Sequence, residues 1–147
     1  MDRSVAVLLT AVVGGGVALQ APINSYLGKH VGTFQAAFVS FVVGTAVLLV
    51  IAALAKGGLG ELRHAGEPGW LYLTGGLFGV AFVTTVLVTV RTLGAGGVTA
   101  ATIAGQLTVA IIIDQLGILH VEQKSITLAR IAGVALLAAG VFLIVRN

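Results

Sequence analysis

Long apolar runs separated by short polar stretches dominate the chain. A helix that spans a bilayer needs about 20 apolar residues, because it rises 1.5 Å per residue. Five runs reach or approach that length, and none alternates apolar and polar positions as a membrane β-strand does. The pattern predicts an all-α integral membrane protein with five transmembrane helices, at about residues 4–26, 34–55, 70–90, 98–119 and 129–145.

The segments between these runs are short and polar. Residues 29–32 are predicted to join the first two helices, and residues 56–69 form the longest predicted loop. Trp70 then opens the third run, as aromatic residues do at a membrane interface. Residues 91–97 are predicted to form a Gly-rich turn. Short connections place successive helices antiparallel, so we expect one transmembrane domain over residues 1–147.

The first run resembles a signal peptide only at its start. It continues to Tyr26, and Pro22 lies where a cleavage site would need small residues, which indicates a retained helix.

An odd number of helices puts the two chain ends on opposite faces of the membrane. The positive-inside rule places the N-terminus in the cytoplasm, but by a small margin that permits insertion in both orientations. Five basic residues lie on the N-terminal face and three on the other: Arg3, Lys56, Arg63, Lys124 and Arg130 against Lys29, Arg91 and Arg146.

Composition agrees with this interpretation. The chain is 58% hydrophobic and 9% charged, with a mean hydropathy of +1.11, whereas a soluble domain carries about 25% charged residues. Basic residues are scattered singly between apolar runs, so we expect the lipid bilayer and no nucleic acid as a partner. The chain has no cysteine, which excludes disulfides and thiolate metal sites, and no cofactor is expected.

Polar residues inside the first run are candidates for substrate binding. Gln20 and Asn24 are four residues apart and share a helix face, with Pro22 between them. One interpretation is a polar pocket where proline kinks or breaks the helix. The other is that the helix ends here and both amides lie at the membrane interface.

The fourth run carries further polar candidates. Thr102 and Gln106 lie on one stripe, and Gln106 falls near the bilayer midplane, where its amide needs a hydrogen-bond partner. Asp114 is the only acid inside a long apolar run. A charge at mid-helix costs about 2.5–3.5 kcal/mol on insertion scales. Gln106 has two interpretations, a hydrogen bond between packed helices or a contact with substrate. Asp114 also has two: a functional role, or a side chain that simply reaches interfacial water.

Two weaker patterns have two interpretations each. Arg91 followed by Gly94 to Gly97 is either an anion-entry site at a helix start or a tight turn with an interfacial arginine. Small residues at helical spacing serve packing within one protomer or form a dimer seam. These small residues are Ala36, Ser40, Gly44, Gly75, Gly79, Gly133, Ala135, Ala139 and Gly140.

Enzymatic signatures are missing from the sequence. No serine or cysteine nucleophile accompanies a buried base, and His30, His64 and His120 lie in predicted loops without metal-ligand spacing. We therefore expect no enzymatic activity and no metal.

Helix direction suggests how the polar groups could come together. Within one protomer, Gln20 and Asn24 lie toward the far membrane face, whereas Asp114 lies toward the N-terminal face. An inverted second copy would bring its Asp114 level with Gln20 and Asn24, which is the logic of inverted-repeat transporters.

Three stretches resemble the YdcZ-type family of the drug/metabolite transporter superfamily. They are QAPINSYLG from Gln20 to Gly28, FVSFVVGT from Phe38 to Thr45, and AGQLTVAIIIDQLG from Ala104 to Gly117. The resemblance covers nearly the whole chain. Where the family's aspartate is often followed by histidine, this chain has Gln115.

The resemblance implies a multi-pass protein of the bacterial inner membrane that works as two five-helix halves in opposite orientation. We expect a secondary transporter of a small polar solute, neutral or anionic, formed by an inverted homodimer. Gln20, Asn24, Thr102, Gln106 and Asp114 are the expected substrate-binding residues. The alternatives are a non-transporting membrane partner or assembly protein, and a small multidrug-type cation exporter. The exporters of that last type have a carboxylate in the first helix, which this chain lacks.

Overall fold

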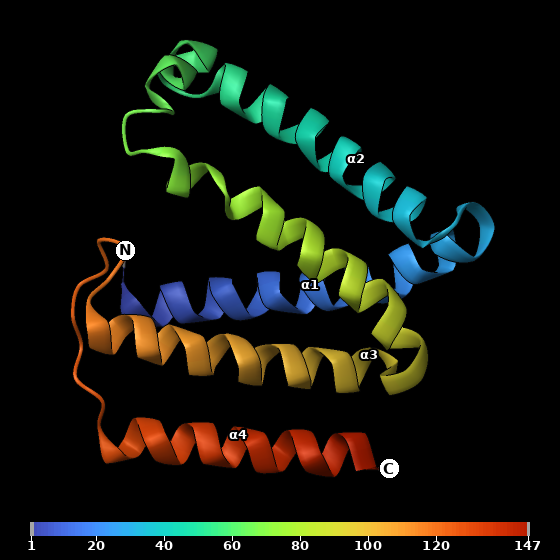
Figure 1. The fold of residues 1–147 in the computed structure, drawn as a ribbon, viewed down its shortest axis with the longest axis vertical. Helices are drawn as coiled ribbons and strands as arrows, with labels where there is room; N and C mark the ends of the chain where they lie inside the picture. Colours follow the sequence, from blue (N-terminus) through green and yellow to red (C-terminus); the bar gives the residue numbers. More distant parts are fainter. Residues whose placement is uncertain (1, 147) are drawn as a thin grey trace. The chain divides into compact units, whose positions relative to one another are not determined.

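The computed structural model describes residues 2–146, and every long element in that range is an α-helix (Figure 1). The elements are α1 (Arg3–Val31), α2 (Thr33–Leu54), the 3₁₀ helices η1 (Gly58–His64) and η2 (Trp70–Leu73), α3 (Gly75–Leu116) and α4 (Leu128–Arg146). No strand occurs within the described residues, so the all-α prediction is confirmed. Among residues 2–146, four helical stretches are long and apolar enough to cross a membrane: Arg3–Val31, Thr33–Leu54, Trp70–Leu116 and Leu128–Arg146.

The joint between α1 and α2 is a single residue, which corrects the predicted loop over residues 29–32. α1 continues through Pro22 to Val31, so the interpretation that the helix ends near Asn24 is also wrong. Gly32 has φ 96° and ψ 152°, a backbone conformation that is open almost only to glycine. Glycine at this position therefore lets the chain pass from one helix to the next without a loop.

α3 contains a break rather than the predicted turn over residues 91–97. Its residues are helical throughout that range except Gly94, which has φ 68° and ψ 169°. A straight helix of 42 residues would be about 63 Å long, roughly twice the hydrocarbon thickness of a bilayer. With the break counted, α3 consists of two helical segments, residues 75–93 and 95–116. The described chain then has five long helical segments, as predicted.

The other predicted boundaries change by a few residues. The third helix starts at Gly75, because residues 70–73 form η2. The fourth ends at Leu116 and not at residue 119, because Gly117, Leu119 and His120 have positive φ angles that no α-helix accommodates.

The chain divides into two compact units, Met1–Arg91 and Thr92–Asn147. In the N-terminal unit, α2 and the first segment of α3 run antiparallel. The ring of Phe41 lies 3.5 Å from the position that a Cβ on Gly79 would occupy. At the opposite end of that contact, Arg91 bonds to Thr33. Ala36 and Leu87 form the centre of the apolar core between them and are almost completely buried.

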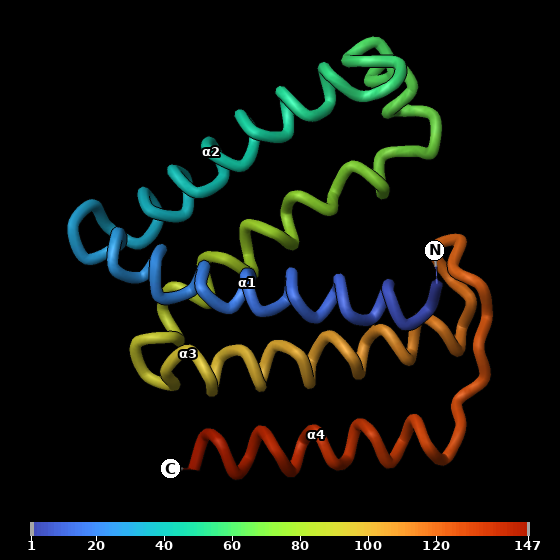
Figure 2. Tube along the Cα trace, turned by 180° about the vertical axis from the view of Figure 1, so that it is seen from behind, coloured from blue at the N-terminus to red at the C-terminus, as the bar shows by residue number. Residues whose placement is uncertain are grey.

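The C-terminal unit is an antiparallel pair formed by the second segment of α3 and by α4, which lie side by side in Figures 1 and 2. A Cβ on Gly97 would be 3.5 Å from Val145, so the start of one helix meets the end of the other. At the other end of the pair, Asp114 faces Arg130. Residues 117–127 connect the two helices without regular structure.

Most of the apolar surface of these helices is not covered by protein. In the apolar 18-residue stretch that marks each candidate membrane span, at most 17% of the residues are buried. The small residues divide in the same way: Ala36 and Gly79 pack within the N-terminal unit, whereas a Cβ on Gly44, Gly133 or Gly140 would meet nothing within 4 Å. The surrounding lipid, or another protein, must therefore cover the rest.

Gly94 provides a direct test of the break in α3. Replacing it by alanine puts a Cβ at φ 68° and ψ 169°, a region used almost only by glycine, so we expect a loss of about 1–3 kcal/mol in folding free energy. Gly96→Ala is the matched control, because Gly96 is helical and a Cβ there meets nothing within 4 Å. The readout is the midpoint of thermal unfolding of the purified protein in detergent. Equal midpoints for the two variants would contradict the assigned break.

Candidate functional site

A partly buried hydrogen bond links a polar residue of α1 to one of α2. The Asn24 side-chain amide donates to the Ser40 hydroxyl over 3.0 Å, and Asn24 is only 6% exposed. Ser25 is buried beside it. Such a bond contributes about 0.5–1.5 kcal/mol, and losing one partner leaves a desolvated polar group. Asn24 therefore lies in the interior of the N-terminal unit and does not face water at a helix end.

Arg91 lies over the joint between α1 and α2. Its Nη2 is 3.2 Å from the position that a Cβ on Gly28 would occupy, so the absence of a side chain at Gly28 makes room for the guanidinium. The same nitrogen donates to the Thr33 hydroxyl over 3.4 Å. Arg91 remains exposed, and it contributes a positive charge at this end of the unit.

Asp114 has a cationic partner in its own chain. Its Oδ2 lies 3.2 Å from Nη1 of Arg130, with side-chain exposures of 29% for Asp114 and 32% for Arg130. The N–H directions of Nη1 miss the carboxylate, so this nitrogen is buried without a hydrogen bond. The contact is therefore an electrostatic one between two partly buried charges.

Gln115 holds the connecting segment that positions Arg130. Its side-chain oxygen accepts a hydrogen bond from the Ile126 backbone N–H at 2.6 Å, and its carbonyl accepts one from the Gln123 side chain at 2.9 Å. The Lys124 backbone N–H donates to the Asp114 carbonyl at 2.8 Å. Gln115, which stands where the family often has histidine, thus ties the connecting segment to the end of α3. None of these hydrogen bonds involves the Asp114 carboxylate.

Three predicted site residues belong to neither the Asn24–Ser40 pair nor the Asp114–Arg130 pair: Gln20, Thr102 and Gln106. Gln20 and Gln106 are exposed, and Thr102 is half-buried. Within residues 2–146, no hydrogen bond involves the amide of Gln20 or of Gln106. Gln106 lies at the middle of the segment 95–116, and Gln20 lies about 5 Å beyond the middle of α1. Two unpaired amides therefore project from the central parts of apolar helices.

The histidines make local contacts. His30 is hydrogen-bonded to the Tyr26 carbonyl at 3.0 Å, and His64 pairs with Glu67. Among the described residues, no group of three or more His, Cys, Asp or Glu side chains could hold a metal ion.

Ser40 and Arg130 are not predicted as partners from the sequence, although their spacing carries a signal. Asn24 and Ser40 each lie eight residues from Gly32. Asp114 and Arg130 likewise flank the segment between two neighbouring helices. Residues equidistant from a helical hairpin turn lie at the same level along the two helices, so polar residues so placed are candidate partners.

These helices and their interior polar groups define a multi-pass, all-α integral membrane protein. The sequence model of the family described as "Putative inner membrane exporter, YdcZ" matches residues 5–143, which is nearly the whole chain. The chain belongs to the YdcZ family, as its three motifs predict. It is accordingly a membrane transport protein located in the bacterial inner membrane. Neither the curated proteins nor the solved structures contain a match to the chain.

The Asp114–Arg130 contact predicts a non-additive pair of mutations. Asp114→Asn and Arg130→Gln should each destabilise the protein, because each leaves one partly buried charge without its partner, and the double variant should recover part of the loss. Since both side chains are about one-third exposed, we expect a coupling energy on the order of 1 kcal/mol. Unfolding of the four proteins by denaturing detergent measures it.

Arg146→Gln is the matched control for this cycle, because Arg146 lies at the other end of α4, over the ring of Phe142. Its effect should add to that of Asp114→Asn without coupling. If the effects of Arg130→Gln and Asp114→Asn on stability were also additive, the two side chains would not interact, and the assigned ion pair would be wrong.

Proposed function

We propose that the protein is a secondary transporter made of two copies in opposite orientations, which carries a small polar solute by alternating access. Each protomer crosses the bilayer five times, with the segments 75–93 and 95–116 as separate crossings. These two segments are about 29 Å and 33 Å long, and each length suits one crossing of the bilayer.

The observation that carries this proposal is the pair of unpaired amides. An amide moved into hydrocarbon without a hydrogen bond costs roughly 4–8 kcal/mol relative to water. Gln20 and Gln106 are exposed near the middle of their helices, so a partner protein or a hydrated cavity must supply their hydrogen bonds. Groups at the midplane stay at the midplane when a copy is inverted, so two inverted copies share one polar layer there.

Thr102 adds a half-buried hydroxyl one helical turn from Gln106 on the same segment. Gln20, Thr102 and Gln106 are the proposed substrate contacts. Asn24 and Asp114 already have partners in their own protomer. Their participation in the layer, as predicted from the sequence, requires these contacts to exchange during the transport cycle.

The charge pattern favours a neutral or anionic solute. The carboxylate of Asp114 is neutralised by Arg130, so it is not a free anion that would attract a lipophilic cation. The cations Lys29 and Arg91 lie at the helix ends nearest the Asn24–Ser40 pair, and positive charge there attracts anions. Nothing in this arrangement resembles a site for quaternary ammonium ions.

Orientation can be tested with single cysteines, because the chain has none of its own. In spheroplasts, a membrane-impermeant maleimide should label about half of the Lys29→Cys protein and about half of the Lys56→Cys protein, since both orientations are inserted. Val109→Cys, inside a span, is the unlabelled control. If one position labels completely and the other does not label at all, with no inverted partner co-expressed, the dual-topology dimer is wrong.

The polar layer can be tested by transport into inside-out vesicles. Vesicles that contain the wild-type protein should accumulate uncharged polar or anionic solutes from a metabolite mixture, measured by mass spectrometry. Gln106→Leu should lower that accumulation by about 5-fold to 150-fold, because loss of one hydrogen bond to a desolvated group is worth about 1–3 kcal/mol. Leu107→Ile, on the neighbouring position, should leave it unchanged.

Accumulation of quaternary ammonium ions by the wild-type protein would identify a cation exporter instead. A second outcome is that the wild-type protein is inserted and dimeric but accumulates no solute, and that Gln106→Leu preserves the dimer. The protein is then better described as a non-transporting membrane partner.

A further inference from the structure

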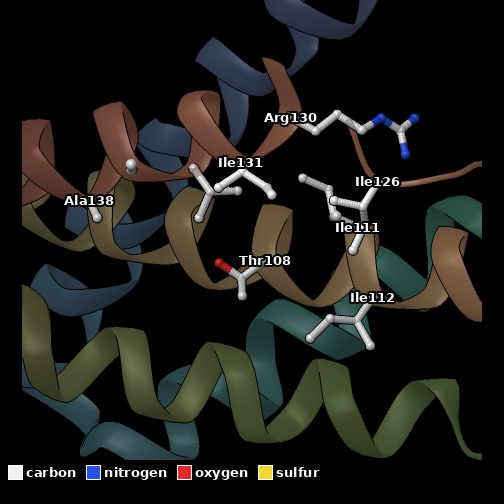
Figure 3. Close-up of a pocket in the computed structure, with 9 residues that line it drawn as sticks. Thr108, Ile111, Ile112, Ile126, Arg130, Ile131 and Ala138 are labelled. Atoms are coloured by element: carbon white, nitrogen blue, oxygen red, sulfur yellow. The ribbon is translucent and has the colours of Figure 1, made fainter. Parts of the chain in front are cut away.

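The C-terminal unit contains an aliphatic groove of about 300 Å³ between α4 and the second segment of α3 (Figure 3). Its walls come from both helices and include Ile111, Ile131 and Val134. Ala135 and Ala138 leave room for the groove because their side chains are small. A volume of about 300 Å³ is at the lower end of the range for small-molecule sites, which are mostly apolar with a few polar groups.

A single charge marks one end of this groove. Arg130 is the third residue of α4, and Figure 3 shows it at the end near Ile126, with Ala138 at the opposite end. Ala138 is eight residues further along, or about 12 Å into the span. The groove therefore runs from a cation near the membrane interface to an aliphatic tract deeper in the bilayer. A phospholipid has the same order, with a charged headgroup at the surface and an acyl chain along the membrane normal.

Arg130 has donors available for a headgroup phosphate. A guanidinium carries five N–H groups. Nη1 is buried against Asp114, but the Arg130 side chain as a whole is 32% exposed, so its other N–H groups can reach a headgroup. Guanidinium groups bind phosphate oxygens through paired N–H donors. Because Asp114 neutralises part of the charge, the headgroup contact is expected to be moderate in strength.

The groove is too small to hold the body of a helix from a second copy, which could place only side chains in it. A helix 12 Å long and about 10 Å in diameter occupies roughly 900 Å³, which is three times the volume of the groove. A single acyl chain is much thinner. We propose that this groove binds one acyl chain of an anionic phospholipid, whose phosphate lies on Arg130. This site does not depend on the proposed transport function.

Native mass spectrometry of the detergent-solubilised protein can test the proposal with two lipids of equal chain length. Phosphatidylglycerol should be retained in preference to phosphatidylcholine. Arg130→Gln should lower phosphatidylglycerol retention about fivefold and leave phosphatidylcholine unchanged, because one basic side chain contributes roughly that factor at a membrane surface. Arg146→Gln, at the other end of α4, is the matched control and should retain both lipids as the wild type does.

Two further variants keep the test independent of folding. Asp114→Asn frees Arg130 from its counter-charge, so phosphatidylglycerol retention should rise, whereas general damage to the fold would lower it. Ala135→Phe fills the groove and should lower retention of both lipids. A phosphatidylglycerol with a photoreactive acyl chain should cross-link to residues 104–116 and 128–146 in the wild-type protein but not in Ala135→Phe.

Equal losses in Arg130→Gln and Arg146→Gln, or unchanged lipid retention in Ala135→Phe, would overturn the proposal. Dissociation of a dimer by Ala135→Phe with no change in bound lipid would show that a second copy occupies the groove.

Discussion

Hydrocarbon offers no hydrogen-bond partner, and this constraint governs where polar side chains occur along the chain. Each polar group in a span has to be satisfied within the protein, or by something that the protein brings next to it. Thr10, Thr89 and Thr108 meet the constraint alone, because each hydroxyl donates to the carbonyl four residues earlier at 2.8–3.0 Å. Asn24 and Asp114 need a second helix, and both find one across a neighbouring hairpin.

Helix positions were predictable from the sequence because hydrophobic length directly reflects bilayer thickness. The joints were not, because they depend on single backbone conformations. Gly32 and Gly94 each turn the chain in one residue, and nothing in the hydrophobic pattern distinguishes them from the many other glycines. Lys29 and His30 were assigned to a loop because they are polar, yet α1 contains both. A helix of 29 residues is about 43 Å long, so its ends extend beyond the hydrocarbon, where polar side chains are tolerated.

The candidate site was predictable as a set of residues but not as a set of contacts. Asp114 and Asn24 stood out because polar groups in apolar runs are rare. Arg130 did not, since a basic residue at the start of a span has an ordinary role as a flanking charge. Only the antiparallel pairing of α4 with the second segment of α3 brings its guanidinium to Asp114. Gln115 also bonds the connecting segment to the end of α3, next to this ion pair.

Among the side-chain amides and the carboxylate discussed above, depth separates those that are paired in the protomer from those that are not. Asn24 lies about 10 Å from the middle of α1, and Asp114 lies about 13 Å from the middle of its segment. Both have partners in the same chain. Gln20 and Gln106, within about 5 Å of the middle, have none. In a parallel dimer, equal depths coincide everywhere, so groups at any depth could be shared between copies. Inversion keeps a midplane group level with its own counterpart in the second copy, whereas a group near one face becomes level only with groups near the other face. Asn24 and Asp114 are placed for such an exchange, but each already has a partner in its own protomer. The midplane amides of Gln20 and Gln106 have no such partner, so they are the groups that an inverted second copy is free to satisfy.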